Sequence, residues 1–127
     1  MDAEQHTVAV LGASANRAKY GNKAVRAYLA EGWQVFPVNP RGGVIEGLPV
    51  KPTLDSIEAA LDRVSVYLPP AVSLEVLPEL AAVGANQVWF NPGSADDEVL
   101  DRARELGLGV HSACSIVDIG RSPSEFR

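Results

Sequence analysis

Cysteine and histidine are scarce in this chain of 127 residues, which has one Cys and two His. A single thiol, Cys114, excludes an internal disulfide framework. Together with His6 and His111 it makes too small a set of ligands for a cysteine-rich zinc site. We therefore expect an intracellular, cytoplasmic protein whose fold depends on its hydrophobic core.

Long apolar runs and an excess of positive charge are also absent. No apolar run approaches the ~20 residues that cross a bilayer, and the opening MDAEQH is acidic and polar where a signal peptide is basic and then apolar. The formal net charge is −5, whereas nucleic-acid binding needs many Lys and Arg side chains. We predict no membrane or nucleic-acid partner, so backbone N–H groups and a few cations must hold any anionic ligand.

Short apolar segments alternate with helical patterns along the chain. Five segments rich in β-branched and aromatic residues are predicted strands, at residues 7–11, 34–38, 64–68, 87–91 and 108–112. Helical patterns cover residues 22–31, 54–61, 73–83 and 95–106. Such alternation requires parallel pairing through crossovers. We predict an α/β fold, a Rossmann-like doubly wound parallel five-stranded sheet with helices on both faces, and one domain over residues 1–127.

Two of the predicted helices carry a specific local expectation. Pro78 lies inside the pattern 73–83, which implies either a kink or a later start of that helix. Ser94 is the expected N-cap of the last helix, where Asp96 and Asp97 complement the helix dipole.

The loop after the first strand, in VAVLGASANRAKYG, combines features of an anion site. Ligands of open parallel sheets bind beyond the carboxyl ends of the strands. Gly12 permits a tight turn and close approach of a ligand, and Ser14 offers a hydroxyl and an N–H group near a helix start. Arg17 and Lys19 add positive charge. This combination predicts a site for phosphate or pyrophosphate.

The same loop departs from the dinucleotide fingerprint G-x-G-x-x-G. Counting from Gly12, the second and third glycine positions hold Ser14 and Arg17. The second strand ends in Asn39 and then Arg41, where a nicotinamide or flavin dinucleotide site would have an acidic residue for the ribose hydroxyls. A cation there favours a ligand with one more phosphate near its ribose. Coenzyme A, with a 3′-phosphate, and NADP, with a 2′-phosphate, both satisfy this charge pattern.

The stretch VAVLGASANRAKYGNKAVRAYLAEGWQVFPVNPRGGVIEGLPVKPTLDSI closely resembles the N-terminal half of small stand-alone CoA-binding domain proteins. It is also similar to the CoA-binding domain of the succinyl-CoA synthetase α-subunit and of acyl-CoA synthetases. The matching pieces are the G-A-S turn, the pair Tyr20-Gly21, the V-N-P-basic end of the second strand, and EGLPVKPTLDSI. The resemblance continues through SVYLPPAVSLEVLPELAAVGANQVWFNPGS into the region of Cys114, and so covers nearly the whole chain.

This resemblance implies that coenzyme A lies across the strand ends. The pyrophosphate would lie within the first loop, the nucleotide beside the second, and the adenine or pantetheine against an apolar wall in the third, while a glycine lets the fourth loop come close. The implied site residues are Gly12, Ala13, Ser14, Arg17, Lys19, Tyr20, Asn39, Pro40, Arg41, Leu68, Pro69, Pro70 and Gly93. Many relatives have a basic residue where this chain has Pro69 and Pro70, which implies one phosphate contact fewer.

The sequence offers little catalytic chemistry. It has no G-x-S-x-G elbow, H-E-x-x-H helix or P-loop lysine motif, and the histidine that the synthetase relatives phosphorylate belongs to a domain absent here. We interpret His111 as a packing or hydrogen-bonding residue. Cys114 follows the fifth strand, and one hypothesis is a mixed disulfide with the CoA thiol. We predict a non-catalytic protein that binds coenzyme A or acyl-CoA; the alternative is an NAD(P)-binding regulatory or oxidoreductase domain. A protein partner or a homodimer stays open.

Overall fold

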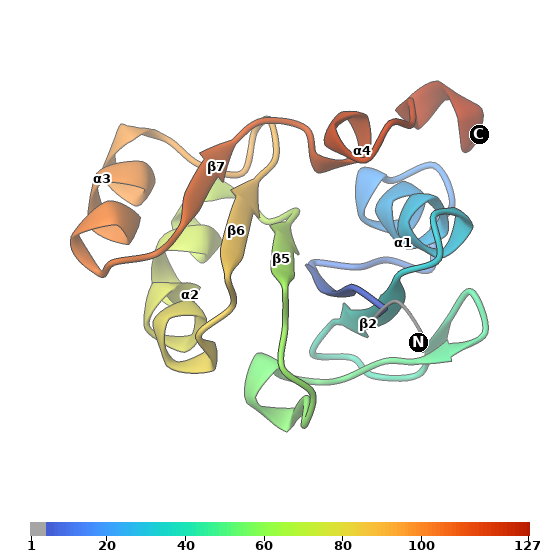
Figure 1. The fold of residues 1–127 in the computed structure, drawn as a ribbon, viewed down its shortest axis with the longest axis horizontal. Helices are drawn as coiled ribbons and strands as arrows, with labels where there is room; N and C mark the ends of the chain where they lie inside the picture. The colour runs from blue at the N-terminus through green and yellow to red at the C-terminus, as the bar shows by residue number, and fades with distance from the viewer. Residues whose placement is uncertain (1–4) are drawn as a thin grey trace.

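Five parallel strands form the central sheet of the computed structural model, which describes residues 5–127. Residues 1–4, within the acidic opening segment considered above, lie outside the described residues. The strands are β1 (Thr7–Leu11), β2 (Gln34–Val38), β5 (Arg63–Val66), β6 (Gln87–Phe90) and β7 (Val110–Ser112). Their spatial order is β2-β1-β5-β6-β7, with every pair parallel (Figure 1). The predicted Rossmann-like sheet is confirmed.

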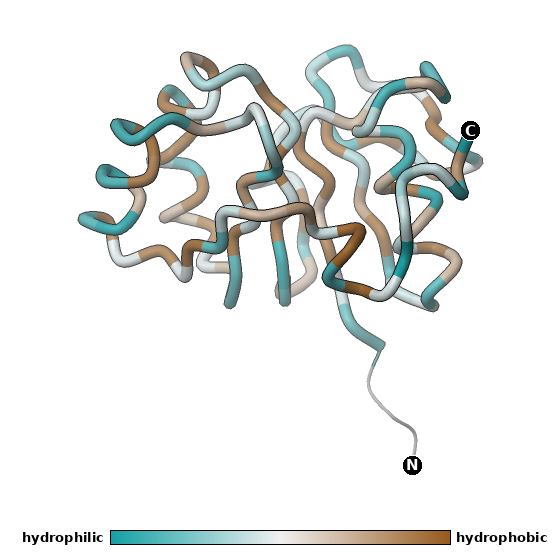
Figure 2. The backbone as a smooth tube through the Cα atoms, turned by 90° about the horizontal axis from the view of Figure 1, so that it is seen from above, coloured by the Kyte–Doolittle hydropathy of each residue, from teal (hydrophilic) through white to brown (hydrophobic). Residues whose placement is uncertain are grey.

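Helices cover both faces of the sheet (Figure 1). One face packs against α1 (Tyr20–Ala30) and α4 (Ser115–Asp118), and the other against α2 (Pro70–Val83) and α3 (Asp97–Glu105). Because side chains alternate along a strand, Val8 and Val10 join the first core and Ala9 and Leu11 the second. Figure 2 shows hydrophobic residues gathered in the central strands and hydrophilic ones on the outer turns of the helices. Within the described residues, no helix has both the length and the apolar character for crossing a membrane.

Three helices begin at residues that differ from those predicted by the sequence pattern. Helix α1 begins at Tyr20, two residues earlier. Helix α2 begins at Pro70 and runs through Pro78, so the later start is wrong; a proline is tolerated at the first helical position because its missing N–H would have no intrahelical partner there. Asp96, not Ser94, caps α3, since its carboxylate accepts a hydrogen bond from Val99 N at 3.0 Å.

The predicted helix over residues 54–61 is wrong. Only a 3₁₀ turn, η1 (Leu54–Ser56), forms there, and Ile57 already has extended backbone angles. Ser56 Oγ donates to Thr53 O at 2.6 Å, a local bond of the kind that competes with helix formation. A short hairpin that we did not predict, β3 (Val44–Ile45) with β4 (Leu48–Pro49), precedes this turn.

The C-terminal segment returns beside α1 (Figure 1). It contains α4 and a second 3₁₀ turn, η2 (Pro123–Glu125). The Arg26 guanidinium of α1 donates to Phe126 O at 2.9 Å and to Arg17 O at 2.7 Å. One side chain thus connects the end of the chain to the loop that follows β1.

Aromatic residues outside the predicted site pack against a charged side chain. The Arg63 guanidinium lies 5.2 Å from the Trp33 ring and 4.6 Å from the Trp89 ring, and it pairs with Asp118 at 2.8 Å. The His111 ring stacks on Trp89 with centroids 4.5 Å apart. His111 therefore has the packing role expected from the sequence.

Asp62 gives a prediction about stability. Its carboxylate accepts a hydrogen bond from the N–H of Thr7, at the start of β1, at 2.8 Å, and this bond lowers the pKa of Asp62. A carboxyl group whose pKa is lower in the folded than in the unfolded state stabilises the fold when it is ionised. This contribution is fully present at pH values above the unfolded pKa of about 3.9, and it is lost as the pH falls through the folded pKa. We expect Asp62→Asn to reduce the free energy of unfolding by about 0.5–1 kcal/mol at pH 7, and to have no effect once the pH is below the folded pKa of Asp62.

Urea denaturation between pH 2.5 and 7 measures this difference. Asp101→Asn, which changes a carboxylate that is 75% exposed, is the matched control and should leave the profile unaltered. An Asp62→Asn profile parallel to that of the wild type would contradict the assignment.

Candidate functional site

A cleft of about 890 Å³ opens beyond the carboxyl ends of the strands. Strand β2 follows β1 in the chain and lies on one side of the β1–β5 pair, whereas β6 follows β5 and lies on the other side. The boundary between β1 and β5 is therefore a topological switch point, where ligands usually bind in such sheets. The volume falls within the range of about 300–1,000 Å³ that is common for small-molecule sites. Most of the predicted residues line the cleft, namely Gly12, Ala13, Ser14, Lys19, Tyr20, Asn39, Arg41, Leu68, Pro69, Pro70 and Gly93.

The turn at Gly12 and Ala13 shapes the cleft but supplies no N–H donor to it. Gly12 has φ of +89°, and a Cβ there would lie 2.3 Å from the carbonyl oxygen of Tyr67, so a side chain is excluded. The N–H groups of Gly12 and Ala13 both donate to Val38 O at 3.2 Å. These two amides are therefore engaged with β2, and an anion must find its donors elsewhere in the loop.

Donors are available at the start of α1. Lys19 is the N-cap and forms no side-chain capping bond. Within residues 5–127, the N–H groups of Ser14, Tyr20 and Gly21 have no hydrogen-bond partner. Unpaired amides and the positive end of the helix dipole together favour an anion at this place.

Gly21 allows α1 to start this close to the turn. A Cβ on Gly21 would lie 2.4 Å from Gly12 O. Gly21 thus provides the close packing between helix and turn that the third glycine of a dinucleotide fingerprint provides. The pair Tyr20-Gly21 in the sequence was the available signal, although only Tyr20 was assigned to the site.

The cations of the predicted site divide into two groups. Lys19 and Arg41 line the cleft, and neither forms an ion pair with another described residue. Arg17 does not line it; its guanidinium pairs with Glu46, with Nε and Oε2 3.4 Å apart. Glu46 lies at the tip of the unpredicted hairpin and also accepts from Asn22 Nδ2 at 3.1 Å. The contact of Arg17 with a ligand phosphate therefore stays a prediction, and Pro40 also lies outside the lining.

Asn39 holds the first two loops together. Its Nδ2 donates to Ala13 O at 2.8 Å, while its Oδ1 accepts from Arg41 N at 2.8 Å. An amide can donate and accept at once, whereas an ionised carboxylate only accepts. The residue at the end of β2 thus positions the neighbouring loop and Arg41, a role that the acid of a dinucleotide site could not fill.

The remaining wall of the cleft is largely apolar. Leu68, Pro69 and Tyr67 follow β5, and the Tyr20 ring, 57% exposed, lies opposite at the start of α1. Burial raises the pKa of Tyr67, so its hydroxyl stays protonated at physiological pH. The sequence analysis missed five lining residues, all neighbours of predicted ones: Ala18, Gly21, Tyr67, Pro92 and Ser94.

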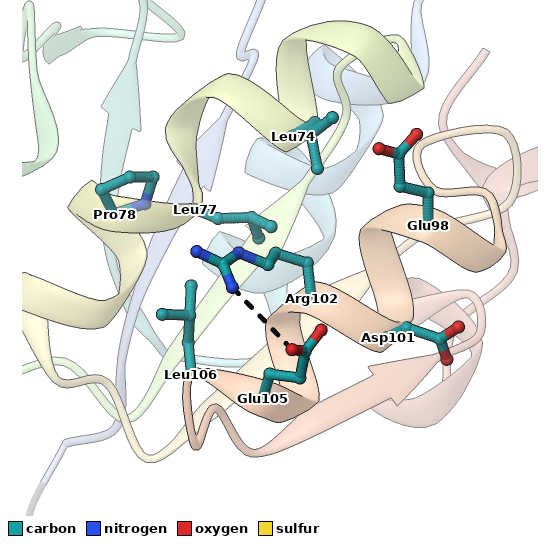
Figure 3. A pocket seen from close by; sticks show the side chains of 8 residues that line it. All are labelled: Leu74, Leu77, Pro78, Glu98, Asp101, Arg102, Glu105 and Leu106. Carbon is teal, nitrogen blue, oxygen red and sulfur yellow. Dashed lines mark ion pairs between the residues drawn. The ribbon is translucent and has the colours of Figure 1, made fainter.

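Another hollow, of about 670 Å³, lies between α2 and α3 (Figure 3). Leu74, Leu77 and Leu106 give it an apolar floor. Acidic side chains dominate its rim, and its Arg102 is paired with Glu105 at 3.8 Å (Figure 3). Such a rim repels phosphates, so this hollow is poorly suited to an anionic ligand. Among residues 5–127, no His, Cys, Asp and Glu side chains form a group of three or more that could hold a metal ion.

A family model described as CoA binding domain matches residues 6–120. The chain belongs to this CoA-binding domain family. The resemblance inferred from the sequence is thereby confirmed, and membership supports coenzyme A binding as the general function of this CoA-binding domain. The cleft at the switch point, with its unpaired amides and two cations, suits a ligand that carries several phosphates.

Solved structures agree with the family. A conserved hypothetical protein from Pyrococcus furiosus is 32% identical, with a TM-score of 0.81 over 91% of this chain and 99% of that chain. A protein from Thermus thermophilus, named cell-free ID.343, is 30% identical, with a TM-score of 0.82 over 90% and 87%. An acetyl-coenzyme A synthetase 1 from Korarchaeum cryptofilum, solved with phosphate and ADP, shares the fold at 22% identity, with a TM-score of 0.73 over 84% of this chain and 25% of that chain.

Gly21 provides a test of the packing at the helix start. In Gly21→Ala, the new methyl group must displace the turn or the helix, which costs about 1–3 kcal/mol of stability. We expect coenzyme A binding to weaken about tenfold or more, because a charge-assisted hydrogen bond lost from the phosphates is worth at least that much. Calorimetry below the unfolding temperature measures the affinity.

Gly32→Ala is the control for the change in stability. Gly32 lies at the far end of α1 with φ of +80° and no neighbouring atom within 4 Å of an added Cβ, so this variant is strained by about 1–2 kcal/mol without touching the cleft. Equal losses of affinity in the two variants would contradict a local role for Gly21.

Proposed function

We propose that this CoA-binding domain is a non-catalytic binding module for coenzyme A or acyl-CoA, which holds the ligand's pyrophosphate at the start of α1. The observation that carries the proposal is the uncapped helix end inside the cleft: Tyr20 and Gly21 offer unpaired N–H groups beside Lys19. The dipole of an 11-residue helix adds to their attraction for an anion.

The nucleotide end of the ligand would lie toward the loop after β2. Arg41 is exposed there, and Asn39 fixes its backbone. A guanidinium at this place suits the 3′-phosphate of coenzyme A. Leu68 and Pro69 offer an apolar surface to the adenine, which needs shape more than charge.

The environment of the hydroxyl groups supports a non-catalytic role. A nucleophilic hydroxyl needs a base within hydrogen-bond reach. Ser14 Oγ instead accepts from Asn16 N at 3.0 Å, and Ser94 Oγ donates to Asn91 O at 2.7 Å. Neither histidine is part of the cleft lining.

Competition among nucleotides tests the ligand. A ligand that binds only the folded state raises the free energy of unfolding by an amount that grows with the logarithm of its affinity. We expect coenzyme A to raise the melting temperature most, ahead of NADP, ADP and NAD at equal concentration, because only coenzyme A combines the pyrophosphate with a 3′-phosphate. Stabilisation by NAD without stabilisation by coenzyme A would refute the proposal and favour the alternative, an NAD(P)-binding domain.

Arg41 tests the orientation of the ligand. Reversing its charge in Arg41→Glu should reduce the affinity for coenzyme A about tenfold, equivalent to ~1.4 kcal/mol for a partly screened charge pair. The affinity for dephospho-CoA, which lacks the 3′-phosphate, should fall much less. Arg104→Glu on α3, whose side chain is 59% exposed, makes the same change in net charge far from the cleft and controls for long-range effects. Equal losses for the two ligands in Arg41→Glu would dismiss this role.

A further inference from the structure

A smaller cavity of about 280 Å³ adjoins the cleft. We call it the annex. It shares Tyr20, Tyr67 and Pro92 with the cleft. It is completed by Asn91, which follows β6, and by Cys114 and Pro123 of the C-terminal segment. The shared walls mean that a ligand lying along the cleft can extend into the annex without leaving the protein surface.

The annex is suited to an uncharged group. Two prolines, two aromatic rings and a thiol contribute most of its wall, and none of its six lining residues is acidic or basic. Asn91 is the one amide, and its polar atoms are already used: Nδ2 donates to Ser65 Oγ and Val66 O at 2.9 Å, and Oδ1 accepts from Ser115 N at 2.8 Å. A carboxylate placed here would be desolvated without a cation to pair with.

Two lining residues of the annex, Tyr20 and Tyr67, carry hydroxyl groups, and Tyr67 is the more buried of the two. Among residues 5–127, the Tyr67 hydroxyl lies near Ser65 and makes one long hydrogen bond, 3.5 Å to Ser115 Oγ. That serine is held more tightly by Ser65 Oγ, at 2.7 Å. Tyr67 can therefore donate its proton to a ligand oxygen at little cost to the buried network, which matches one carbonyl group.

We propose that the annex holds the acyl group of a short, uncharged acyl-CoA, with the Tyr67 hydroxyl donating to the thioester carbonyl oxygen. This inference rests on the proposed function, because the phosphates and nucleotide must occupy the main cleft. The small volume limits the acyl chain, since sites for drug-sized ligands start at about 300 Å³. The protein then distinguishes acyl-CoA from free coenzyme A by the acyl group itself.

Calorimetry with a series of thioesters, in a reducing buffer that prevents disulfides, tests this proposal. Each buried methylene improves the dissociation constant about fourfold, so butyryl-CoA should bind about tenfold or more tighter than coenzyme A. Succinyl-CoA, which adds a carboxylate, should bind no tighter than coenzyme A. Equal affinity for butyryl-CoA and coenzyme A would overturn the inference while leaving the proposed function intact. Binding of neither would overturn both.

Two variants link the preference to the annex. Cys114→Phe fills the cavity and should bring the dissociation constants of butyryl-CoA and coenzyme A within about twofold of each other. Val117→Phe is the matched control, because it adds the same ring to the same segment at a side chain that is 60% exposed, and it should keep the preference. Tyr67→Phe removes only the hydroxyl and should reduce the preference about fivefold, the value of one hydrogen bond. A full preference in Cys114→Phe and in Tyr67→Phe would refute the location.

Discussion

Helix α1 begins in direct contact with the turn that follows β1, and this contact leaves no room for a side chain on Gly21, while the loop after β5 leaves none on Gly12. The Gly12 carbonyl oxygen occupies the place of a Cβ on Gly21, and the Tyr67 carbonyl oxygen that of a Cβ on Gly12. Three segments, from β1, α1 and β5, therefore approach each other mainly through backbone atoms. The unpaired amides of the helix start thereby lie at the switch point of the sheet, where a ligand can reach them.

Polar side chains then fix the loops around this contact. Asn22 is fully buried, donates to Ser14 O at 3.0 Å and accepts from Arg26 Nε at 2.7 Å. Asn39 connects the loop after β2 to Ala13 from the other side. A buried polar group is tolerated when its hydrogen bonds are satisfied, and it then specifies one arrangement. The first loop is thus held from α1 and from β2, which pre-organises the cleft and reduces the entropy lost on binding.

The sequence predicted the parts of this structure that depend on local pattern. The strands 7–11 and 34–38 match β1 and β2 at both ends, because a buried parallel strand is a continuous apolar run. The prediction of a helix over residues 54–61 failed because Ser56 bonds to nearby backbone and Ile57 takes an extended conformation. The apolar Leu54, Ile57 and Leu61 are buried there without forming a helix.

In the candidate site, too, features set by local sequence were predicted and features set by distant contacts were not. Residues assigned by position after a strand, such as Ser14, Asn39 and Leu68, do line the cleft. Arg17 does not line the cleft and pairs with Glu46, which lies 29 positions away in the chain on a hairpin that no periodicity revealed. The direction of the Gly12 and Ala13 amides toward Val38 was equally hidden, since it depends on the pairing of β1 with β2. Sequence order thus identified the loops that form the cleft, whereas contacts distant in the chain decided which of their donors and cations remain available to a ligand.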